Sequence, residues 1–304
     1  MKNVLCMEHS HRWSWGFTLR ELIKRMFQYK FVKILWQPGR MVDDDLVDHF
    51  DITMVQNLDN IKSIKNKSKV VSRIGGFFVD KDNASNRFDL ELSQVAAVIA
   101  TNNKLYEVGK RINKNTFMIP NCVDLDLFKP DPERIFITSK PFVVGFAGNI
   151  RGVGMNYKGY KYYVDATIGM YPKVKTFNLL FGHNQIPHEE MPEKFFNKID
   201  CLILPSIDEG CSNTVMEALA CGVPVLLTKV CFHGERLEDG LNCLFIKRDI
   251  NDIIEKITIL MNNPSLRKRL SFNGRYFAKG HHDINKMVTE YNKVFNLVLK
   301  KGTN

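Results

Sequence analysis

The feature that most restricts the fold is an alternation of short, almost wholly apolar runs with longer amphipathic stretches. A strand that is apolar on both faces must be buried on both faces, which is typical of a parallel sheet between two layers of helices. The pattern therefore predicts an α/β fold. Thr18 and Glu21 have the spacing of a capping box at the first helix. In the first part of the chain the expected strands are residues 4–7, 31–36, 52–56, 69–74 and 95–100, and the expected helices are residues 18–27 and 104–112.

One stretch interrupts the alternation. Residues 120–141 show little periodicity and contain four prolines. Proline ends helices and strands, so we interpret this stretch as a linker between domains. After it the alternation restarts and predicts a second doubly wound parallel sheet. Its expected strands are residues 142–147, 176–181, 200–205 and 223–228, and the expected helices are residues 158–171, 213–221, 249–261, 265–277 and 283–299.

The length of 304 residues is more than one compact core usually contains, which agrees with two domains. We expect the first at residues 1–125 and the second at residues 126–282. In open parallel sheets, ligands bind where strands end and helices begin. Binding residues are therefore expected in strand-to-helix loops.

The composition indicates the cellular compartment and the kind of binding partner. Hydrophobic residues make up 44% of the chain and charged residues 25%, as in a soluble globular protein. The apolar run before Glu8 is too short for a signal peptide or a membrane span, so we expect a cytoplasmic protein, with peripheral membrane association as an option. The net charge of +10 favours anionic partners: nucleotide phosphates, acidic lipid surfaces or nucleic acid.

The cysteines form no recognisable metal motif. Cys201, Cys211, Cys221 and Cys231 recur at ten-residue intervals, which matches no common ligand spacing. Seven cysteines are an odd number and too few for a disulfide scaffold in a chain of this length. We interpret them as small buried hydrophobes and expect no metal site.

The stretch EGCSNTVMEALACGVPV places two carboxylates at the start of one predicted helix. Glu209 precedes the helix, Glu217 lies about one turn inside it, and Gly222 ends it. The backbone N–H groups from Cys211 to Thr214 carry the positive end of the helix dipole, which suits a phosphate. A ligand whose phosphate binds the amides and whose hydroxyls bind the carboxylates would fit this arrangement. A nucleotide-sugar has both kinds of group. A glutamate in a first turn also stabilises the dipole without any ligand.

A second loop supports a phosphate ligand. In GNIRGVGMNYKG, Arg151 and Lys158 flank a glycine-rich turn that opens a helix. Two cations can neutralise a diphosphate without a divalent metal, and no DxD-like pair stands in the second half of the sequence. The aspartate run at residues 43–45 lies in the first domain and reads as a solvated turn. We therefore expect catalysis without a metal or another cofactor.

Three segments resemble glycosyltransferase family 4, the retaining enzymes of the GT-B fold. They are FVVGFAGNIRGVGMNYKGYKYYVDA, DCLILPSIDEGCSNTVMEALACGVPVLLT and the linker IPNCVDLDLFKP. The resemblance covers mainly residues 95–250, and the first domain diverges. It implies two Rossmann-like, doubly wound domains facing across a cleft, one for the acceptor and one for the donor. It also implies a C-terminal helix, residues 283–304, that packs back on the first domain.

The resemblance implies roles for particular residues. Arg151, Lys158 and Glu209 would be catalytic: the cations hold the donor diphosphate, and Glu209 contacts hydroxyls of the sugar. Glu217 would hold the ribose, and Gly182 would line the side of the base. The rest of the donor pocket would consist of Gly148, Asn149, Gly210, Cys211, Ser212, Asn213 and Thr214.

The implied reaction moves a hexose or pentose from a nucleotide-diphosphate-sugar, such as a UDP-sugar, to a hydroxyl of a glycan or a lipid-linked glycan. The anomeric configuration is retained, and the leaving phosphate takes the proton of the acceptor. The enzyme then mainly positions groups and stabilises charge, so no acid–base pair is needed.

Some positions depart from the family pattern. Cys211 stands where an aromatic or small residue is common, and Cys122 and Cys231 replace glycines. The double glycine expected after the first strand is absent, and a Gly–Gly pair instead follows a later strand. The acceptor-side candidates are therefore Trp15, Arg73, Gly75 and Gly76, of which the last three also suit a plain tight turn.

Other acceptors and another function class stay open. Residues 18–35 mix basic and aromatic side chains, which suits an anionic membrane carrying a lipid-linked acceptor or an ordinary amphipathic helix with a solvated basic face. DNA with hydroxylated bases, as in viral glycosyltransferases, is a less favoured acceptor. The net charge suits its phosphates, and Trp13, Trp15 or residues 77–78 can stack a flipped base. A protein of this fold that binds nucleotide or carbohydrate without catalysis is the remaining alternative.

Overall fold

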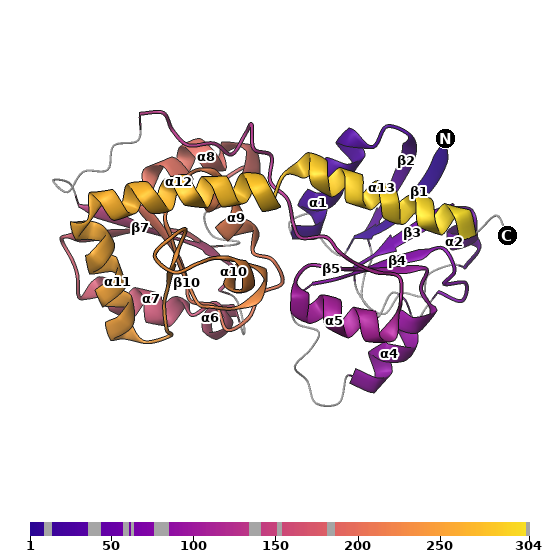
Figure 1. Cartoon of the computed structure of the whole chain (residues 1–304), viewed down its shortest axis with the longest axis horizontal. Helices are drawn as coiled ribbons and strands as arrows, with labels where there is room; N and C mark the ends of the chain where they lie inside the picture. The colour runs from indigo at the N-terminus through magenta and orange to yellow at the C-terminus, as the bar shows by residue number, and fades with distance from the viewer. Residues whose placement is uncertain are drawn as a thin grey trace. The chain divides into compact units, whose positions relative to one another are not determined.

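The computed structural model describes residues 1–8, 14–35, 44–56, 61, 64–75, 85–133, 141–150, 154–180 and 186–301. The chain divides into two compact units (Figure 1). The first unit is Met1–Asn121 together with Ile284–Asn304, and the second unit is Cys122–Asp283. The sequence places the boundary between residues 125 and 126, four residues later than the division by contacts.

The first unit contains a parallel sheet in the order β2-β1-β3-β4-β5-β6. Helices α1 and α13 pack together, as do α4 and α5, and Figure 1 shows these pairs on opposite sides of the sheet. The described strands are β1 (Lys2–Glu8), β2 (Tyr29–Leu35), β3 (Ile52–Val55), β4 (Val70–Ile74), β5 (Ala97–Ala100) and β6 (Thr116–Met118), and the helices are α1 (Ser14–Arg25), α2 (Asp44–Asp48), α4 (Ser85–Gln94), α5 (Asn103–Ile112) and α13 (Ile284–Lys301).

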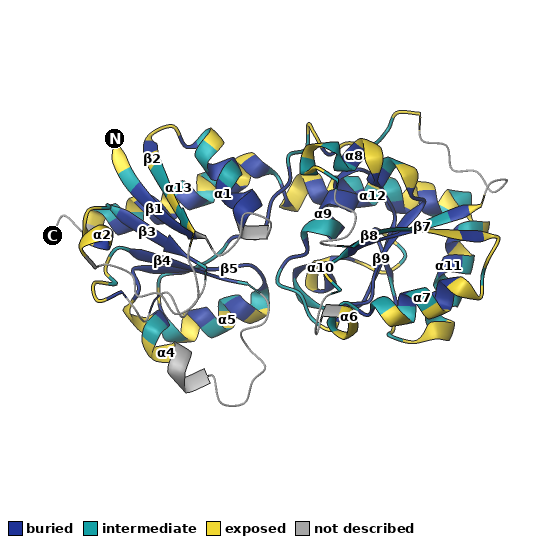
Figure 2. Cartoon of the chain, turned by 180° about the vertical axis from the view of Figure 1, so that it is seen from behind, coloured by how far each residue is buried: buried dark blue, intermediate teal, exposed yellow. Residues whose placement is uncertain are grey.

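The second unit contains a parallel sheet in the order β11-β10-β9-β7-β8. Helices α7 and α11 pack on one side of it, and α9 and α12 on the other (Figures 1 and 2). The described strands are β7 (Phe142–Gly148), β8 (Val174–Leu180), β9 (Cys201–Leu204), β10 (Val225–Leu227) and β11 (Leu244–Phe245), and the α-helices are α6 (Gly154–Tyr157), α7 (Tyr160–Ile168), α8 (Met191–Lys194), α9 (Asn213–Ala220), α10 (Cys231–Arg236), α11 (Ile250–Asn262) and α12 (Pro264–His281).

The burial of the central strands explains why each sheet lies between two layers of helices. Every residue of β3, β4, β5, β9 and β10 is buried, and Figure 2 shows the strands as the darkest part of each unit. Burial on both faces requires a layer of helices on each side, as the uninterrupted apolar runs predict. The prediction of two doubly wound parallel sheets is confirmed.

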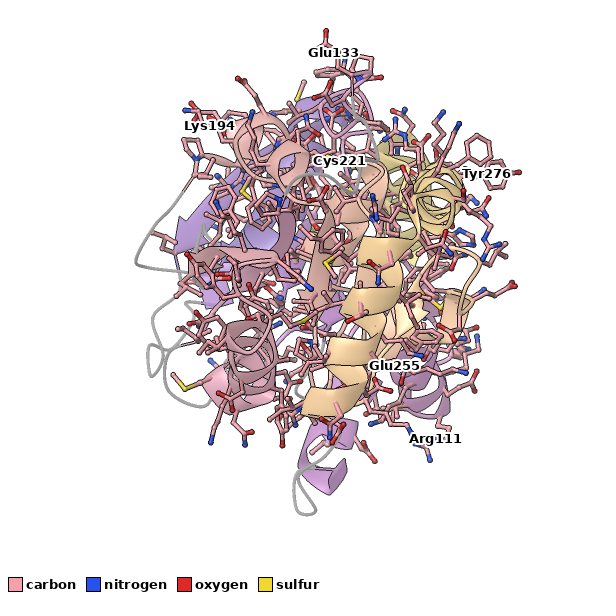
Figure 3. The ribbon with its side chains drawn as sticks, turned by 90° about the vertical axis from the view of Figure 1, so that its left-hand side faces the viewer. Arg111, Glu133, Lys194, Cys221, Glu255 and Tyr276 are labelled. Carbon is pink, nitrogen blue, oxygen red and sulfur yellow. The ribbon has the colours of Figure 1, made fainter. Side chains whose placement is uncertain are left out.

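Helix α9 ends as its sequence predicts. It stops at Ala220, and Gly222 has a φ of 65°, the left-handed conformation that glycine adopts at the end of a helix. Arg275, on α12, donates hydrogen bonds to the carbonyl oxygens of Ala220 at 2.7 Å and Leu125 at 2.9 Å, and to that of Phe128. Figure 3 labels Cys221, the C-cap of α9, among the side chains of this unit. One guanidinium thus joins the end of α9 to the segment after the unit boundary.

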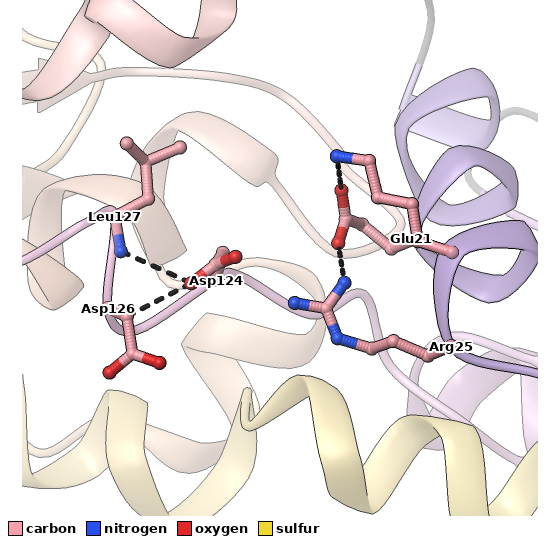
Figure 4. A network of polar contacts seen from close by, with 6 residues as sticks. Glu21, Arg25, Asp124, Asp126 and Leu127 are labelled. Atoms are coloured by element: carbon pink, nitrogen blue, oxygen red, sulfur yellow. Dashed lines mark hydrogen bonds and ion pairs between the residues drawn. The ribbon is translucent and has the colours of Figure 1, made fainter.

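The structure corrects the predicted start of the first helix. α1 begins at Ser14, so Thr18 lies inside the helix and cannot cap it. Glu21 instead forms ion pairs with Lys24 at 3.1 Å and with Arg25, as Figure 4 shows. The same figure shows the Asp124 carboxylate accepting hydrogen bonds from the backbone of residues 126 and 127, a turn in the predicted linker.

Two further differences concern elements. α4 and β6 were not predicted, and the helix predicted at residues 158–171 corresponds to α7, which begins two residues later; the short helix α6 before it was also not predicted. Among the described residues, no helix has both the length and the apolar character needed to cross a membrane.

Candidate functional site

The second unit has a topological switch point between β7 and β9. The chain order runs outward from this pair in both directions, to β8 on one side and to β10 and β11 on the other. In a doubly wound sheet the loops that follow two such strands diverge and leave a crevice for a ligand. The loops after β7 and β9 are the two that the sequence analysis selected.

Lys158 lies in the turn between α6 and α7, shortly after the first of these loops, Glu209 lies in the second loop, and the two form an ion pair. Their side chains are 22% and 15% exposed, so the pair is accessible to a ligand while largely shielded from solvent. The Ser206 hydroxyl also donates to Oε1 of Glu209, at 2.8 Å. A Cβ added at Gly148 would lie 3.9 Å from Cγ of Lys158, so the end of β7 lies beside the lysine. The structure thus unites three of the predicted site residues.

The backbone holds the two loops together. Gly159 has a φ of 67°, and a Cβ added there would lie 2.1 Å from the carbonyl oxygen of Pro205. The N–H of Ile207 donates to the carbonyl oxygen of Tyr157 at 2.8 Å. Only glycine allows both this conformation and this close approach. The position of Lys158 relative to Glu209 is therefore set by backbone contacts.

The N-terminus of α9 lies between the two predicted carboxylates. Ser212 is the N-cap, with extended backbone angles and without a capping hydrogen bond from its side chain. Asn213 and Thr214 form the first turn and are partly exposed, whereas Cys211 and Ser212 are buried. Since the first N–H groups of a helix have no partner within the helix, they can bind an anion.

Glu217 has a partner that the sequence did not predict. It is 4% exposed, and its Oε1 lies 2.9 Å from Nε2 of His188. The His188 ring also contacts the ring of Phe128, with 4.9 Å between the centroids. These contacts fix the orientation of the Glu217 carboxylate on the second turn of α9.

Cys231 connects α10 to the loop of Glu209. Its thiol donates to Oδ1 of Asp208 at 2.9 Å, and its sulfur accepts from the N–H of Glu209. Burial, and then the hydrogen bond to Asp208, raises the pKa of the Cys231 thiol. Its φ is 59°, in the left-handed region, which agrees with the glycine expected at this position from the family pattern.

Cys211 lies in a cluster with two histidines. Its Sγ and the ring nitrogens of His233 and His282 all lie within 4.8 Å of one another, and all three residues are buried. Nε2 of His233 is 3.2 Å from Nε2 of His282. Burial, and then the neighbouring His282, lowers the pKa of His233. The sequence predicted Cys211 as a small buried residue and as part of the donor pocket, and did not predict its contact with histidines.

The acceptor-side candidates lie in the first unit. Arg73 is on β4, is 2% exposed and donates a hydrogen bond to Asn121. Gly75 follows the strand, and a Cβ added there would lie 3.8 Å from Nη1 of Arg73. Trp15 lies on α1. Some predicted residues lie outside the described part of the structure: Gly76, Arg151, Gly182, the side chain of Trp15 and the possible stacking residues 13, 77 and 78.

Part of the second unit is similar to a known protein family. Residues 178–277 match the family model of glycosyl transferases group 1. This part of the chain is therefore similar to a glycosyltransferase group 1 domain. It contains Glu209, Glu217 and the intervening start of α9, whereas Lys158 precedes it.

Curated relatives match the chain over about a third of their own length. An uncharacterised glycosyltransferase of Methanocaldococcus jannaschii is 36% identical over 119 residues, which are 36% of this chain and 33% of that protein. The capsular polysaccharide biosynthesis glycosyltransferase CapM of Staphylococcus aureus is 30% identical over 118 residues, 38% of this chain and 31% of CapM.

Solved structures match the whole chain. The crystal structure of HepE from Anabaena in complex with UDP and glucose has a TM-score of 0.76 at 14% identity, over 97% of this chain and 100% of HepE. The structural neighbours are GT-B glycosyltransferases, and the fold is theirs. The expected GT-B class of two parallel α/β sheets is therefore confirmed.

Proposed function

We propose that the protein is a glycosyltransferase that moves a sugar from a nucleotide-diphosphate-sugar, such as a UDP-sugar, to a hydroxyl of a carbohydrate acceptor. The proposal rests on the Lys158–Glu209 pair at the switch point of the second unit. The group 1 domain, and the UDP and glucose bound by HepE, support a donor of this class.

In this proposal Lys158 binds the donor diphosphate. An ammonium has three N–H donors, enough to contact Glu209 and a phosphate oxygen together. A positive charge fixed beside the diphosphate stabilises the negative charge that grows on it as the glycosidic bond breaks. Arg151 is the second cation of the same loop in the sequence, and we assign it the same task.

Glu209 orients both Lys158 and the sugar. Its Oε1 accepts from Lys158 and Ser206, and its second oxygen can accept from hydroxyls of the sugar. Glu217 binds hydroxyls of the ribose, with His188 as the residue that positions its carboxylate. The N–H groups at the start of α9 bind a phosphate between the two carboxylates.

We further propose that the reaction retains the anomeric configuration and needs no metal for catalysis. The diphosphate leaves on the face that the acceptor hydroxyl attacks, and its oxygen takes the hydroxyl proton. The base in the reaction is then the leaving group, so the protein supplies charge and position.

Donor binding and transfer test this function. The full chain is screened by thermal shift with uridine, guanosine and cytidine diphosphates and their sugars, and the true donor should give the largest stabilisation. Release of nucleoside diphosphate is then measured with a panel of sugar acceptors. Nucleotide binding with no release for any donor would contradict the enzyme proposal and favour a binding protein.

We propose an anionic membrane surface as a partner that presents the acceptor. The support is one face of α12, on which Phe272 and Tyr276 are 73% and 74% exposed. Figure 3 shows the Tyr276 side chain pointing outward. The exposed residues Lys268, Arg269 and Lys279 lie on the same helix, which contains no acidic residue. Basic and aromatic side chains together bind anionic bilayers.

The basic segment at residues 18–35, for which the sequence left a membrane role and an ordinary amphipathic helix open, is less suitable. Glu21 pairs with two of its cations, Lys24 and Arg25, so part of the positive charge of α1 is neutralised within the helix. Phe27 is the exposed aromatic residue that follows α1, at 77%. The two segments can be compared directly by substitution.

A further inference from the structure

The proposed transfer uses none of the side chains of Cys211, His233 and His282, which form a cluster. The three residues come from different elements: the loop before α9, helix α10, and the residue after α12. They are separated by at least 22 residues in the sequence. The fold therefore brings one thiol and two imidazoles to a single buried point.

We propose that Cys211, His233 and His282 bind a zinc ion. Thiolate sulfur and imidazole nitrogen are the two ligand types that zinc prefers in proteins. Three protein ligands leave the fourth tetrahedral position to a water molecule or another small ligand. On binding, the Cys211 thiol releases its proton to the solvent and binds as thiolate.

The separations agree with a tetrahedral ion. With zinc–nitrogen bonds of about 2.05 Å, two imidazole nitrogens on one tetrahedral zinc are about 3.3 Å apart. The observed Nε2–Nε2 distance is 3.2 Å. A nitrogen and a sulfur on the same ion are about 3.6 Å apart. All three ligand atoms lie within 4.8 Å, so the sulfur needs to move by at most about 1.2 Å.

The surroundings favour a buried site that suits zinc better than magnesium or calcium. The His282 ring contacts Phe232 and Phe277, with centroid distances of 5.2 and 5.8 Å. His233 and His282 are 2% and 1% exposed, and Cys211 is 6% exposed. The three ligands are a thiol and two imidazoles, whereas magnesium and calcium prefer carboxylate and carbonyl oxygens.

The site would stabilise the loop that carries Glu209. Cys211 lies two residues after Glu209, and the N–H of Phe232, next to His233, donates to the carbonyl oxygen of Gly210 at 3.4 Å. At the other end, the carbonyl oxygen of His282 accepts from the N–H of Val123 at 2.9 Å. Zinc would thus join the proposed donor loop to the segment where the chain enters and leaves the second unit.

Metal analysis of the full chain tests the proposal. The protein is purified without a metal column, treated with a chelator, loaded with zinc and freed of excess metal. We expect about one zinc per chain, and an increase in Tm on loading, because the ion binds the folded state. Cobalt in place of zinc should give a thiolate-to-cobalt charge-transfer band.

Variants identify the ligands. Cys211→Ser and His282→Gln should each weaken zinc binding by about tenfold or more, since even loss of a group behind a ligand has effects of this size. The controls are Cys243→Ser, a buried thiol outside the cluster, and His281→Gln, the exposed neighbour of His282. Both should bind zinc as the unaltered chain does.

Two results would overturn the proposal. One is an unaltered chain that takes up no zinc and shows no cobalt–thiolate band, a measurement that does not depend on any variant. The other is equal zinc binding by Cys211→Ser, His282→Gln and the two controls. None of these readouts requires glycosyl transfer, so the result is independent of the proposed function.

Discussion

The two units share a sheet topology and differ in what their strands present. In the first unit, β2 lies on one side of β1, and β3, β4 and β5 follow on the other side. In the second unit, β8 likewise lies on one side of β7, and β9, β10 and β11 follow on the other side. In the second unit the charged residues Lys158 and Glu209 lie in loops beyond the strands and are partly exposed. In the first unit Arg73 lies within β4 and is 2% exposed.

The difference shows that the sheet topology provides a crevice, and that the residues of the loops determine which ligands the crevice can bind. An accessible ion pair can exchange part of its bonding with a charged ligand. A buried guanidinium bonded to Asn121 mainly stabilises the interior, because its charge is costly without a partner. We therefore assign donor chemistry to the second unit, and four variants test the contrast.

The largest expected effect is on catalysis. Lys158→Ala should lower kcat by about 10²–10³-fold, the usual effect of removing one group that stabilises transition-state charge. The fold should be intact, because backbone contacts of residues 157 and 159 hold this segment in place. The measurements are nucleoside diphosphate release and circular dichroism. Lys161→Ala, an exposed lysine on α7, is the control. Near-normal turnover by Lys158→Ala would contradict the site assignment.

Gly159→Ala should lower the free energy of unfolding by about 3 kcal/mol, because alanine is strained at a φ of 67° and its Cβ would meet the Pro205 carbonyl oxygen. Thermal or urea unfolding measures this loss. Gly169→Ala is the matched control: its φ is −67° and no atom lies within 4 Å of an added Cβ. Equal stability of the two variants would show that the loops are not in backbone contact.

Arg73→Met should lower the free energy of unfolding by about 2 kcal/mol, because it removes a hydrogen bond from a charged donor and leaves Asn121 without it. Donor binding, measured by thermal shift with the nucleotide, should not change. A lower kcat at saturating donor, at a temperature where the variant is folded, would instead support the acceptor role predicted from the sequence.

The smallest expected effect concerns the membrane. Phe272→Ser with Tyr276→Ser should weaken binding to phosphatidylserine vesicles by about tenfold, or ~1.4 kcal/mol. Sedimentation with vesicles measures it, and binding should also fall as salt increases. Phe27→Ser is the matched variant in the first unit. If that variant loses binding and the double variant does not, the membrane surface lies on the segment at residues 18–35.

Sequence reasoning was most successful where one local rule decides the structure. The apolar runs predicted both sheets, and Gly222 predicted the end of α9. It was wrong at Thr18, because Ser14–Arg25 continues the helix upstream of the proposed cap. It also began the helix of α7 too early, at Lys158, because an isolated glycine before a helical pattern does not reveal the positive φ of Gly159.

The site was predictable only in part. Lys158 and Glu209 stand out because each lies in a glycine-containing loop after an apolar run. His188 has no such signal, and its contact with Glu217 depends on a short 3₁₀ helix 29 residues earlier. His233 and His282 are 49 residues apart and meet only through the packing of α10 and α12. Contacts of this range need the tertiary structure.

The distribution of cysteines gives the protein an internal probe of unfolding. Six of the seven are buried, and burial also raises the pKa of Cys231, the partly exposed one. Because alkylating reagents attack the thiolate, the folded chain should react slowly. Cys6 is the single cysteine of the first unit, and the other six lie in the second. Peptide-resolved rates of alkylation would therefore report the opening of each unit separately in the unaltered protein.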